Sequence, residues 1–183
     1  MIAKVTRGAS GRGLIRYLLG LGRANEHTDQ RVISAGLVLG GEALASAKLS
    51  AQEIANLGAA LDEANDAYGT NPMGGHLYHL SLSLPPGDRL LSDDEWGQIA
   101  KMAMESLGFE GKNTQPAAWV AIGHGMSAQG NQHIHIAASL VRIDGSKVYI
   151  WRDRKTLSRV CAESSRPTDS ASSRVERAEG CPG

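Results

Sequence analysis

The sequence predicts an α+β fold, in which helices flank an antiparallel β-sheet. Strand-like and helix-like segments occur along the 183 residues without the strict alternation that a parallel sheet requires. Two capping boxes, Ser50-x-x-Glu53 and Ser92-x-x-Glu95, each mark the start of a helix. Residues 76–84 alternate between apolar and polar, which indicates a strand with one buried face.

The N-terminal half opens with a short alternating strand at 2–6, which a glycine-rich turn ends. Leucines then recur at helical spacing and predict a helix over 12–21. Residues 33–40 begin apolar and β-branched and become glycine-rich, which indicates a strand or an extended segment. The helix that Ser50 caps is expected to run to Tyr68, because a glycine and an Asn-Pro turn follow.

The C-terminal half continues with strands separated by turns. Gly108 is expected to end the helix that Ser92 caps, at about Leu107. Asp144-Gly145 is a hairpin turn, so the segments on either side of it are expected to pair. The other expected elements are strands at 117–123, 133–143 and 148–151 and a last helix at 153–162.

The domain organisation follows from composition. Residues 1–162 are long enough for one domain with its own core, and residues 163–183 form a polar tail with little periodicity. No run of 18 apolar residues predicts a membrane span, and no apolar signal segment begins the chain. Cys161 and Cys181 lack metal or disulfide spacing, so we expect a cytoplasmic protein.

Charge is balanced overall but unevenly distributed. The 19 basic and 19 acidic residues cancel, which argues weakly against binding to nucleic acid. Residues 1–25 nevertheless hold five basic residues and no acid, and residues 141–159 hold six basic residues against two acids. A fold that joins these ends would make a basic surface, whereas scattered charges would only solvate the protein.

Three of the six histidines lie within twelve residues, at His124, His133 and His135. On a strand, His133 and His135 project to the same face, and the isoleucines beside them project into the core. Three neutral imidazoles would hold a metal ion with open coordination positions, as catalysis requires. Alternatively, they are ordinary polar residues on a half-exposed strand. A histidine-triad nucleotide hydrolase is disfavoured, because Ala137 stands where a further histidine is needed.

Tyr17 is the candidate nucleophile, because Arg12 and Arg16 flank it on the first predicted helix. A phenol is a weak nucleophile unless its anion is favoured, as nearby arginines and a metal-bound phosphate would do. The alternative is that Tyr17 only packs against Leu14 and Leu21. Three other tyrosines lack this basic setting: Tyr68, Tyr78 and Tyr149.

These segments resemble the plasmid relaxase and mobilization nuclease family. Residues 124–145 are similar to its three-histidine motif, in which a histidine and a loop precede His-x-His on a strand and a later Asp-Gly. Residues 11–19 resemble the motif that carries the nucleophilic tyrosine, and residues 76–96 resemble the strand, turn and helix between the two motifs. The resemblance covers residues 1 to about 160.

The resemblance implies a relaxase-like antiparallel sheet flanked by helices. It also implies the activity of a conjugative relaxase, a metal-dependent enzyme that cleaves and rejoins DNA by transesterification. Tyr17 would nick one strand at a plasmid transfer origin and later rejoin it, through a 5′-phosphotyrosine intermediate. His124, His133 and His135 would hold Mg²⁺ or Mn²⁺ as a Lewis acid. An acid that orients a histidine is also implied, and the sequence does not choose among three candidates: Asp88, Glu105 and Asp144.

The implied partners are single-stranded DNA at the transfer origin, accessory DNA-binding proteins and a secretion coupling protein. Six arginines are the candidate DNA contacts: Arg7, Arg12, Arg16, Arg142, Arg152 and Arg154.

Two other functions stay open. A rolling-circle replication initiator or transposase-type nuclease shares these residue types, although its tyrosine often follows the histidines, whereas Tyr17 precedes them. A degenerate relaxase that only binds DNA or a partner protein would account for the polar tail at 163–183, where the family usually continues with an apolar helix.

Overall fold

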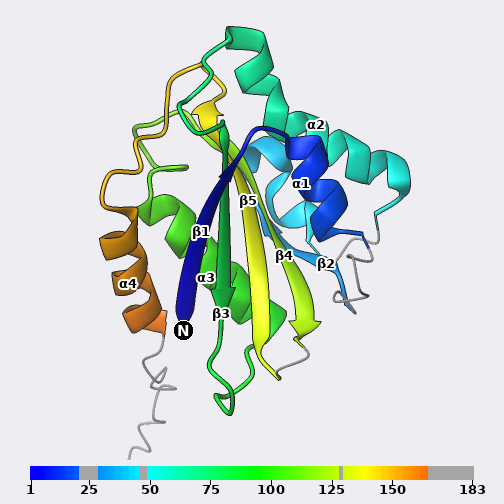
Figure 1. The fold of residues 1–183 in the computed structure, drawn as a ribbon, viewed down its shortest axis with the longest axis vertical. Coiled ribbons are helices and arrows are strands. Elements are labelled where there is room, and N and C mark those ends of the chain that lie inside the picture. The colour runs from blue at the N-terminus through cyan, green and yellow to red at the C-terminus, as the bar shows by residue number, and fades with distance from the viewer. Residues whose placement is uncertain (21–28, 46–48, 128–129, 165–183) are drawn as a thin grey trace, which may run out of the picture.

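The computed structural model describes residues 1–20, 29–45, 49–127 and 130–164. Its strands form one antiparallel sheet in the order β1-β3-β5-β4-β2, with β5 at the centre (Figure 1). The strands are β1 (Ile2–Gly8), β2 (Arg31–Ala35), β3 (Leu77–Ser83), β4 (Ala117–Met126) and β5 (Gln132–Arg142). The predicted α+β class is therefore confirmed.

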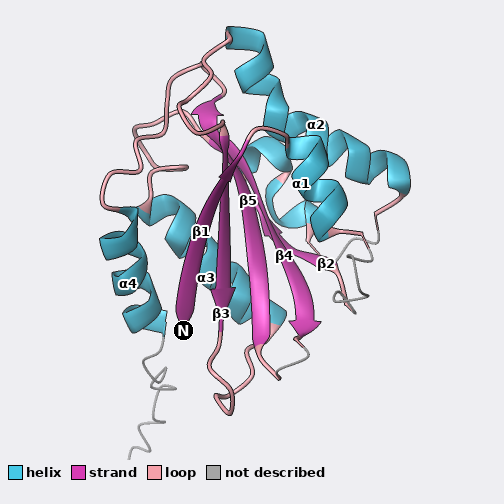
Figure 2. Cartoon of the chain, viewed as in Figure 1, coloured by secondary structure: helices cyan, strands magenta, loops and turns pink. Residues whose placement is uncertain are grey.

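Helices cover both faces of the sheet (Figure 2). The helices α1 (Gly11–Leu18) and α2 (Ala51–Tyr68) pack on one face, and α3 (Asp93–Ser106) and α4 (Asp153–Ser164) pack on the other. Two short 3-10 turns, Leu37–Leu39 and Gly41–Leu44, follow β2. Among the described helices, none combines the length and the apolar character that crossing a bilayer requires.

Local sequence signals account for the ends of the two long helices. Both capping boxes form. The Ser50 and Ser92 hydroxyls accept from the backbone N–H groups of Glu53 and Glu95, and each glutamate carboxylate accepts from the backbone N–H of its serine. Gly69 ends α2 in the left-handed conformation, at a φ of 60°. Helix α3 ends at Ser106, close to the predicted stop.

The two-residue period of the strands divides the core into two layers. Leu80, Leu82 and Ile136 face the layer beneath α3 and α4, whereas Leu77 and Ala137 face the layer beneath α1 and α2. The second face is the one to which the predicted histidines project. A site built on these histidines therefore lies on the α1 side of the sheet.

Several predicted boundaries are wrong. Strand β4 continues to Met126, so His124 lies within the strand and not in the loop after it. Residues 36–40 form a 3-10 turn instead of extending β2, and α1 ends at Leu18.

The predicted strand at 148–151 is also absent. The Asp144-Gly145 turn forms, and one bridge joins Val141 to Lys147, after which the chain turns away toward α4. Helix α4 runs to Ser164, and the rest of the predicted tail lies outside the described residues.

Candidate metal and nucleophile site

The three predicted histidines converge on the α1 side of the sheet. Antiparallel pairing of β4 with β5 sets Ile122 opposite His135 and so brings His124 beside His133 and His135. One ring nitrogen of each histidine lies within 4.8 Å of those of the other two. His124 is buried, and the other two are half-buried. The cluster therefore offers three nitrogen ligands with one side toward solvent, which fits a metal ion.

Hydrogen bonds indicate which ring nitrogen His124 and His135 can offer to a metal. The Nε2 atom of His124 lies 2.7 Å from the carbonyl oxygen of Leu18, which only accepts, so Nε2 carries the proton and Nδ1 keeps its lone pair. The Nδ1 atom of His135 lies 2.9 Å from Nε2 of His79, and Nδ1 of His79 lies 3.1 Å from the Thr6 hydroxyl. Two sets of neutral tautomers satisfy this chain, because the Thr6 hydroxyl can donate or accept. In one of them, His135 donates to His79 and His79 donates to Thr6. That set leaves Nε2 of His135 for a metal.

His79 contacts the cluster and is not among the residues predicted from the sequence. Alternation placed it on the polar face of β3, but nothing in the sequence placed its ring against His135, 56 positions away. Burial lowers the pKa of His79, and the positive charge of Lys4 on β1 lowers it further. Both effects favour the neutral ring that the hydrogen-bond chain requires.

Tyr17 lies one residue before Leu18, on the helix that His124 contacts. Ile15 and Leu18 are fully buried against the sheet, whereas the side chain of Tyr17 is 45% exposed. The phenol is therefore not part of the core, and its helix turn is tied directly to one of the three histidines.

A buried carboxylate fixes the start of the same helix. Asp62 on α2 is 4% exposed and accepts from the backbone N–H of Gly11 at 2.5 Å and from Nε2 of His76 at 2.8 Å. Its other oxygen lies 3.2 Å from the Arg12 guanidinium. An anion at a helix N-terminus bonds free N–H groups and complements the helix dipole. Asp62 thus holds α1 against α2.

The three acids considered in the sequence lie elsewhere. Asp144 sits in the turn beyond the far end of β5 and accepts from Ser146. Glu105 is on α3, on the opposite side of the sheet, and Asp88 is exposed in the turn after β3. The buried acid of the α1 side is Asp62, and its histidine partner is His76, outside the cluster of three.

Arg12 and Arg16 are the two candidate arginines near Tyr17. They line a pocket of about 340 Å³ between α1 and α2, with Leu19 and Ile54 as part of its apolar wall. The Arg12 guanidinium also lies 3.2 Å from Asp62 on α2.

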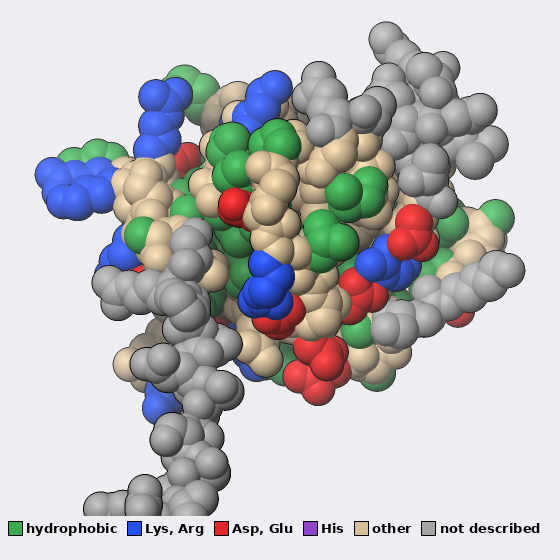
Figure 3. Space-filling model, turned by 90° about the horizontal axis from the view of Figure 1, so that it is seen from below, with side chains coloured by type: hydrophobic (Ala, Val, Ile, Leu, Met, Phe, Trp, Pro, Cys, Tyr) green, Lys and Arg blue, Asp and Glu red, His purple; other side chains and the backbone are tan. Residues whose placement is uncertain are grey.

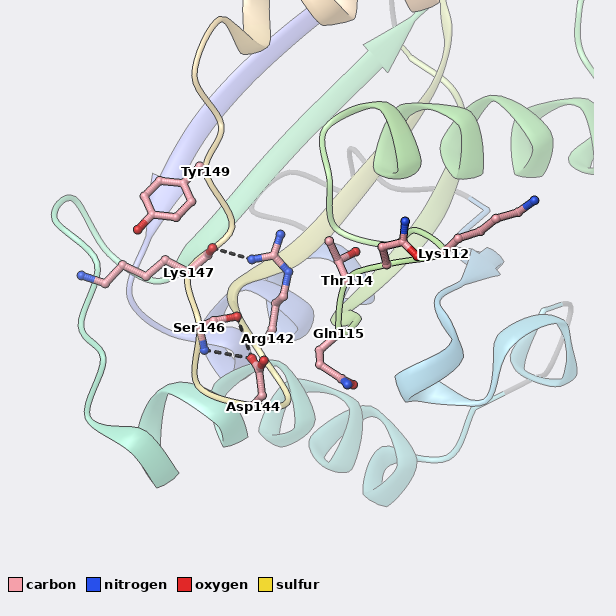
Figure 4. Close-up of a pocket in the computed structure, with 9 residues that line it drawn as sticks. Lys112, Thr114, Gln115, Arg142, Asp144, Ser146, Lys147 and Tyr149 are labelled. Carbon is pink, nitrogen blue, oxygen red and sulfur yellow. Dashed lines mark hydrogen bonds between the residues drawn. The ribbon is translucent and has the colours of Figure 1, made fainter.

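The other four arginines do not line this pocket. Arg7 projects toward the α4 side and donates to the carbonyls of Met73 and Gly75. Arg142 donates to the carbonyls of Gly108 and Lys147 at the far end of β5 (Figure 4). Arg152 and Arg154 lie at the start of α4.

Basic and acidic side chains are interspersed on the lower end of the molecule (Figure 3). Within the described residues, the two basic segments approach each other at Arg7, whose charge interacts with that of Asp153.

Three converging imidazoles beside a helix that presents a phenol are compatible with a metal site next to a nucleophile. The family model described as Relaxase: MobA/VirD2-like, nuclease domain matches residues 38–167, and the chain belongs to this family. The matched span contains all three histidines and begins after Tyr17. A search of the curated proteins finds no match. The resemblance to relaxases is confirmed, and the chain carries a DNA-nicking nuclease domain.

Proposed function

We propose that the protein nicks and rejoins one DNA strand at a plasmid transfer origin, with Tyr17 as the nucleophile. The observation that carries this proposal is the hydrogen bond from His124 to Leu18, because it links the histidine cluster to the helix turn of Tyr17. The family match supports the nuclease activity, and the identity of the nucleophile rests on this geometry.

The proposed reaction is a transesterification at phosphorus. The phenol oxygen of Tyr17 forms a bond to the scissile phosphorus while the bond from phosphorus to the 3′ oxygen breaks. The phenol proton leaves to solvent, and the departing 3′ oxygen takes up a proton. The 5′ phosphate stays on Tyr17 as a phosphodiester, so the reverse attack by a 3′ hydroxyl rejoins the strand without ATP.

His124, His133 and His135 are the proposed ligands of a divalent ion. Such an ion, when bound, supplies Lewis-acid polarisation of the scissile phosphate. Three imidazole nitrogens suit first-row transition ions better than Mg²⁺, which prefers oxygen ligands. Of the two ions expected from the sequence, Mn²⁺ therefore suits this donor set better.

The surrounding residues prepare the site. His79 and Thr6 hold His135 in one tautomer, and the Leu18 carbonyl does the same for His124. Arg12 and Arg16 supply positive charge beside Tyr17, where a phosphate and a phenolate would both be stabilised. We propose that these two arginines contact the strand next to the scissile phosphate.

The test is a covalent-adduct assay with labelled single-stranded oligonucleotides tiled across both strands of the DNA around the gene. The protein is incubated with Mn²⁺ or with EDTA, and the products are resolved on a denaturing protein gel. A metal-dependent protein–DNA band that disappears in Tyr17→Phe and in His133→Ala supports the proposal. Tyr68→Phe is the matched control, and its band should match that of the unmodified protein.

Other outcomes favour the other functions. A band that survives Tyr17→Phe assigns the nucleophile to another tyrosine and contradicts the proposal. Oligonucleotide binding without any band, in each metal tested, would favour a relaxase-derived protein that only binds DNA.

A further inference from the structure

Two aromatic side chains are almost fully exposed just before α4. Tyr149 is 85% exposed and Trp151 is 82% exposed, whereas Trp96 and Trp119 are buried in the core. Exposed aromatic rings this close together are unusual in a chain with only 4% aromatic residues. The hairpin strand predicted at 148–151 does not form, and both rings lie in the irregular segment between β5 and α4.

Basic side chains accompany both rings. Lys147 precedes Tyr149, and the guanidinium of Arg152 lies over the Trp151 ring, 4.5 Å from its centroid. Arg152 adopts a left-handed backbone conformation at a φ of 63°, which is rare for a residue with a side chain. Arg154 and Lys155 follow on the first turn of α4.

The segment borders an open hollow of about 470 Å³, which is visible in Figure 4. Lys147 and Tyr149 form one side of it, and Lys112, Thr114 and Gln115 form the other. The acid of the hollow, Asp144, already accepts from Ser146. The hollow therefore combines exposed cations, neutral polar groups and an aromatic ring.

The base of the segment is anchored. The Tyr78 hydroxyl lies 3.3 Å from Asp153, and the N–H of Val148 donates to the carbonyl oxygen of Leu140. Arg142 ties the two sides of the hollow by donating to the carbonyls of Gly108 and Lys147. The rings of Tyr149 and Trp151 thus project from a backbone that is fixed at both ends.

We infer that Tyr149 and Trp151 form a stacking platform for unpaired bases of DNA, with Lys147, Arg152 and Lys112 contacting the adjacent phosphates. Exposed aromatic rings interleaved with cations bind single-stranded DNA in this way. The rings stack on the faces of the bases, and the cations contact the negatively charged phosphates. The platform would not favour a duplex, whose bases already stack on each other. This inference rests on the proposed function for its choice of DNA over another polyanion.

The platform is separate from the histidine cluster. Lys147 pairs with Val141, which lies six residues along β5 from His135, or roughly 20 Å at the rise of a strand. Bases bound there would belong to a part of the strand several nucleotides from the scissile phosphate. The platform should therefore add to the affinity of any strand that is long enough to span both sites.

Trp151 provides the measurement, because it is the exposed one of three tryptophans. Oligo(dT) of about 20 nucleotides is titrated in EDTA, which separates binding from nicking, and tryptophan fluorescence is followed. We expect quenching that is lost in Trp151→Phe, while that variant still binds. The double variant Tyr149→Ala/Trp151→Ala should bind roughly tenfold or more weakly, as the loss of base stacking implies. Leu37→Ala, which removes another exposed apolar side chain, should bind normally.

The outcomes separate this inference from the proposed function. Quenching by oligo(dT), together with no covalent band in the Mn²⁺ adduct assay described above, would support the platform while contradicting the proposed function. Stronger quenching by a duplex, by anionic lipid vesicles or by an acidic peptide would overturn the platform. Equal affinity of the unmodified protein and of the Tyr149→Ala/Trp151→Ala variant for oligo(dT) would also contradict it.

Discussion

The Nε2 atom of His124 lies 2.7 Å from the carbonyl oxygen of Leu18 and joins the central sheet to the last turn of α1. Both residues are fully buried, and they are separated by 106 positions in the chain. Since Tyr17 directly precedes Leu18, one histidine serves as a candidate metal ligand and also as an anchor for the helix of the candidate nucleophile.

Replacing His124 by Ala should loosen α1 even when no metal is bound. The change leaves the Leu18 carbonyl without its buried donor, which costs about 1–3 kcal/mol. Hydrogen exchange in EDTA should show faster exchange of α1 amides and unchanged exchange in α3. Equal exchange in α1 of both proteins would contradict the anchoring role.

Replacing His79 by Ala should weaken metal binding without removing a ligand. The ring of His135 then loses the acceptor that fixes its tautomer, and the loss of such a partner typically lowers metal affinity by about 10–100-fold. Calorimetric titration with Mn²⁺ measures the change, and His79→Gln should recover part of it because its amide oxygen can accept. Ser83→Ala, on the same strand and face, should bind metal normally. If Ser83→Ala weakens binding as much as His79→Ala does, the effect is not specific to the hydrogen bond.

Gly58→Ala should disrupt the packing of α1 on α2. A Cβ atom at this position would lie 2.7 Å from the Cα of Arg12, which is backbone and cannot rotate away. Such overpacking costs about 1–3 kcal/mol of unfolding free energy. Gly97→Ala is the matched control, because a Cβ there meets its nearest neighbour at 3.6 Å. That helical substitution should be neutral or stabilising by up to about 1 kcal/mol. Urea unfolding of both variants tests the contrast, and equal stabilities would refute the close approach.

Acid should remove the contribution of the ion pair between Arg31 and Asp93. Two bonds of 2.6 Å join them, and the hydrogen bonds from Arg31 hold the pKa of Asp93 below its ordinary value. The folded pKa lies below the unfolded one, so the stabilisation is present above the unfolded value near 3.9 and is lost as pH falls toward the folded value. Both side chains are partly exposed, so the pair contributes less than about 1 kcal/mol.

The measurement compares Asp93→Asn with the unmodified protein by urea unfolding at about pH 6 and about pH 3. The stability gap seen at the higher pH should shrink at the lower one. Asp94→Asn, the neighbouring acid, corrects for the general effect of charge near the start of α3. A gap that stays constant with pH would contradict the assigned role of the pair.

Short-range patterns in the sequence predicted much of the fold. The capping boxes at Ser50 and Ser92 depend on residues three apart, and both form as expected. The alternation around His133 and His135 also placed their side chains on the correct face, because side-chain direction on a strand depends only on position parity.

Long-range contacts were not predictable in this way. The bond of His79 to His135 spans 56 positions, and that of Asp62 to Gly11 spans 51, so neither leaves a local pattern. The false strand at 148–151 failed for a related reason. Its β-branched and aromatic residues favour a strand locally. In the structure, Asp153, the first residue of α4, accepts from the Tyr78 hydroxyl, and the chain leaves the sheet after the bridge at Lys147.

The central claim is that Tyr17 attacks the scissile phosphate, and mass spectrometry of the covalent adduct tests it most directly. The adduct formed with Mn²⁺ is digested with trypsin and a nuclease. Cleavage after Arg16 and Arg23 releases residues 17–23, which contain one tyrosine. We predict a nucleotide mass on that peptide and none after incubation in EDTA. A nucleotide on Tyr68, Tyr78 or Tyr149, or cleaved DNA without any linked peptide, would contradict the account.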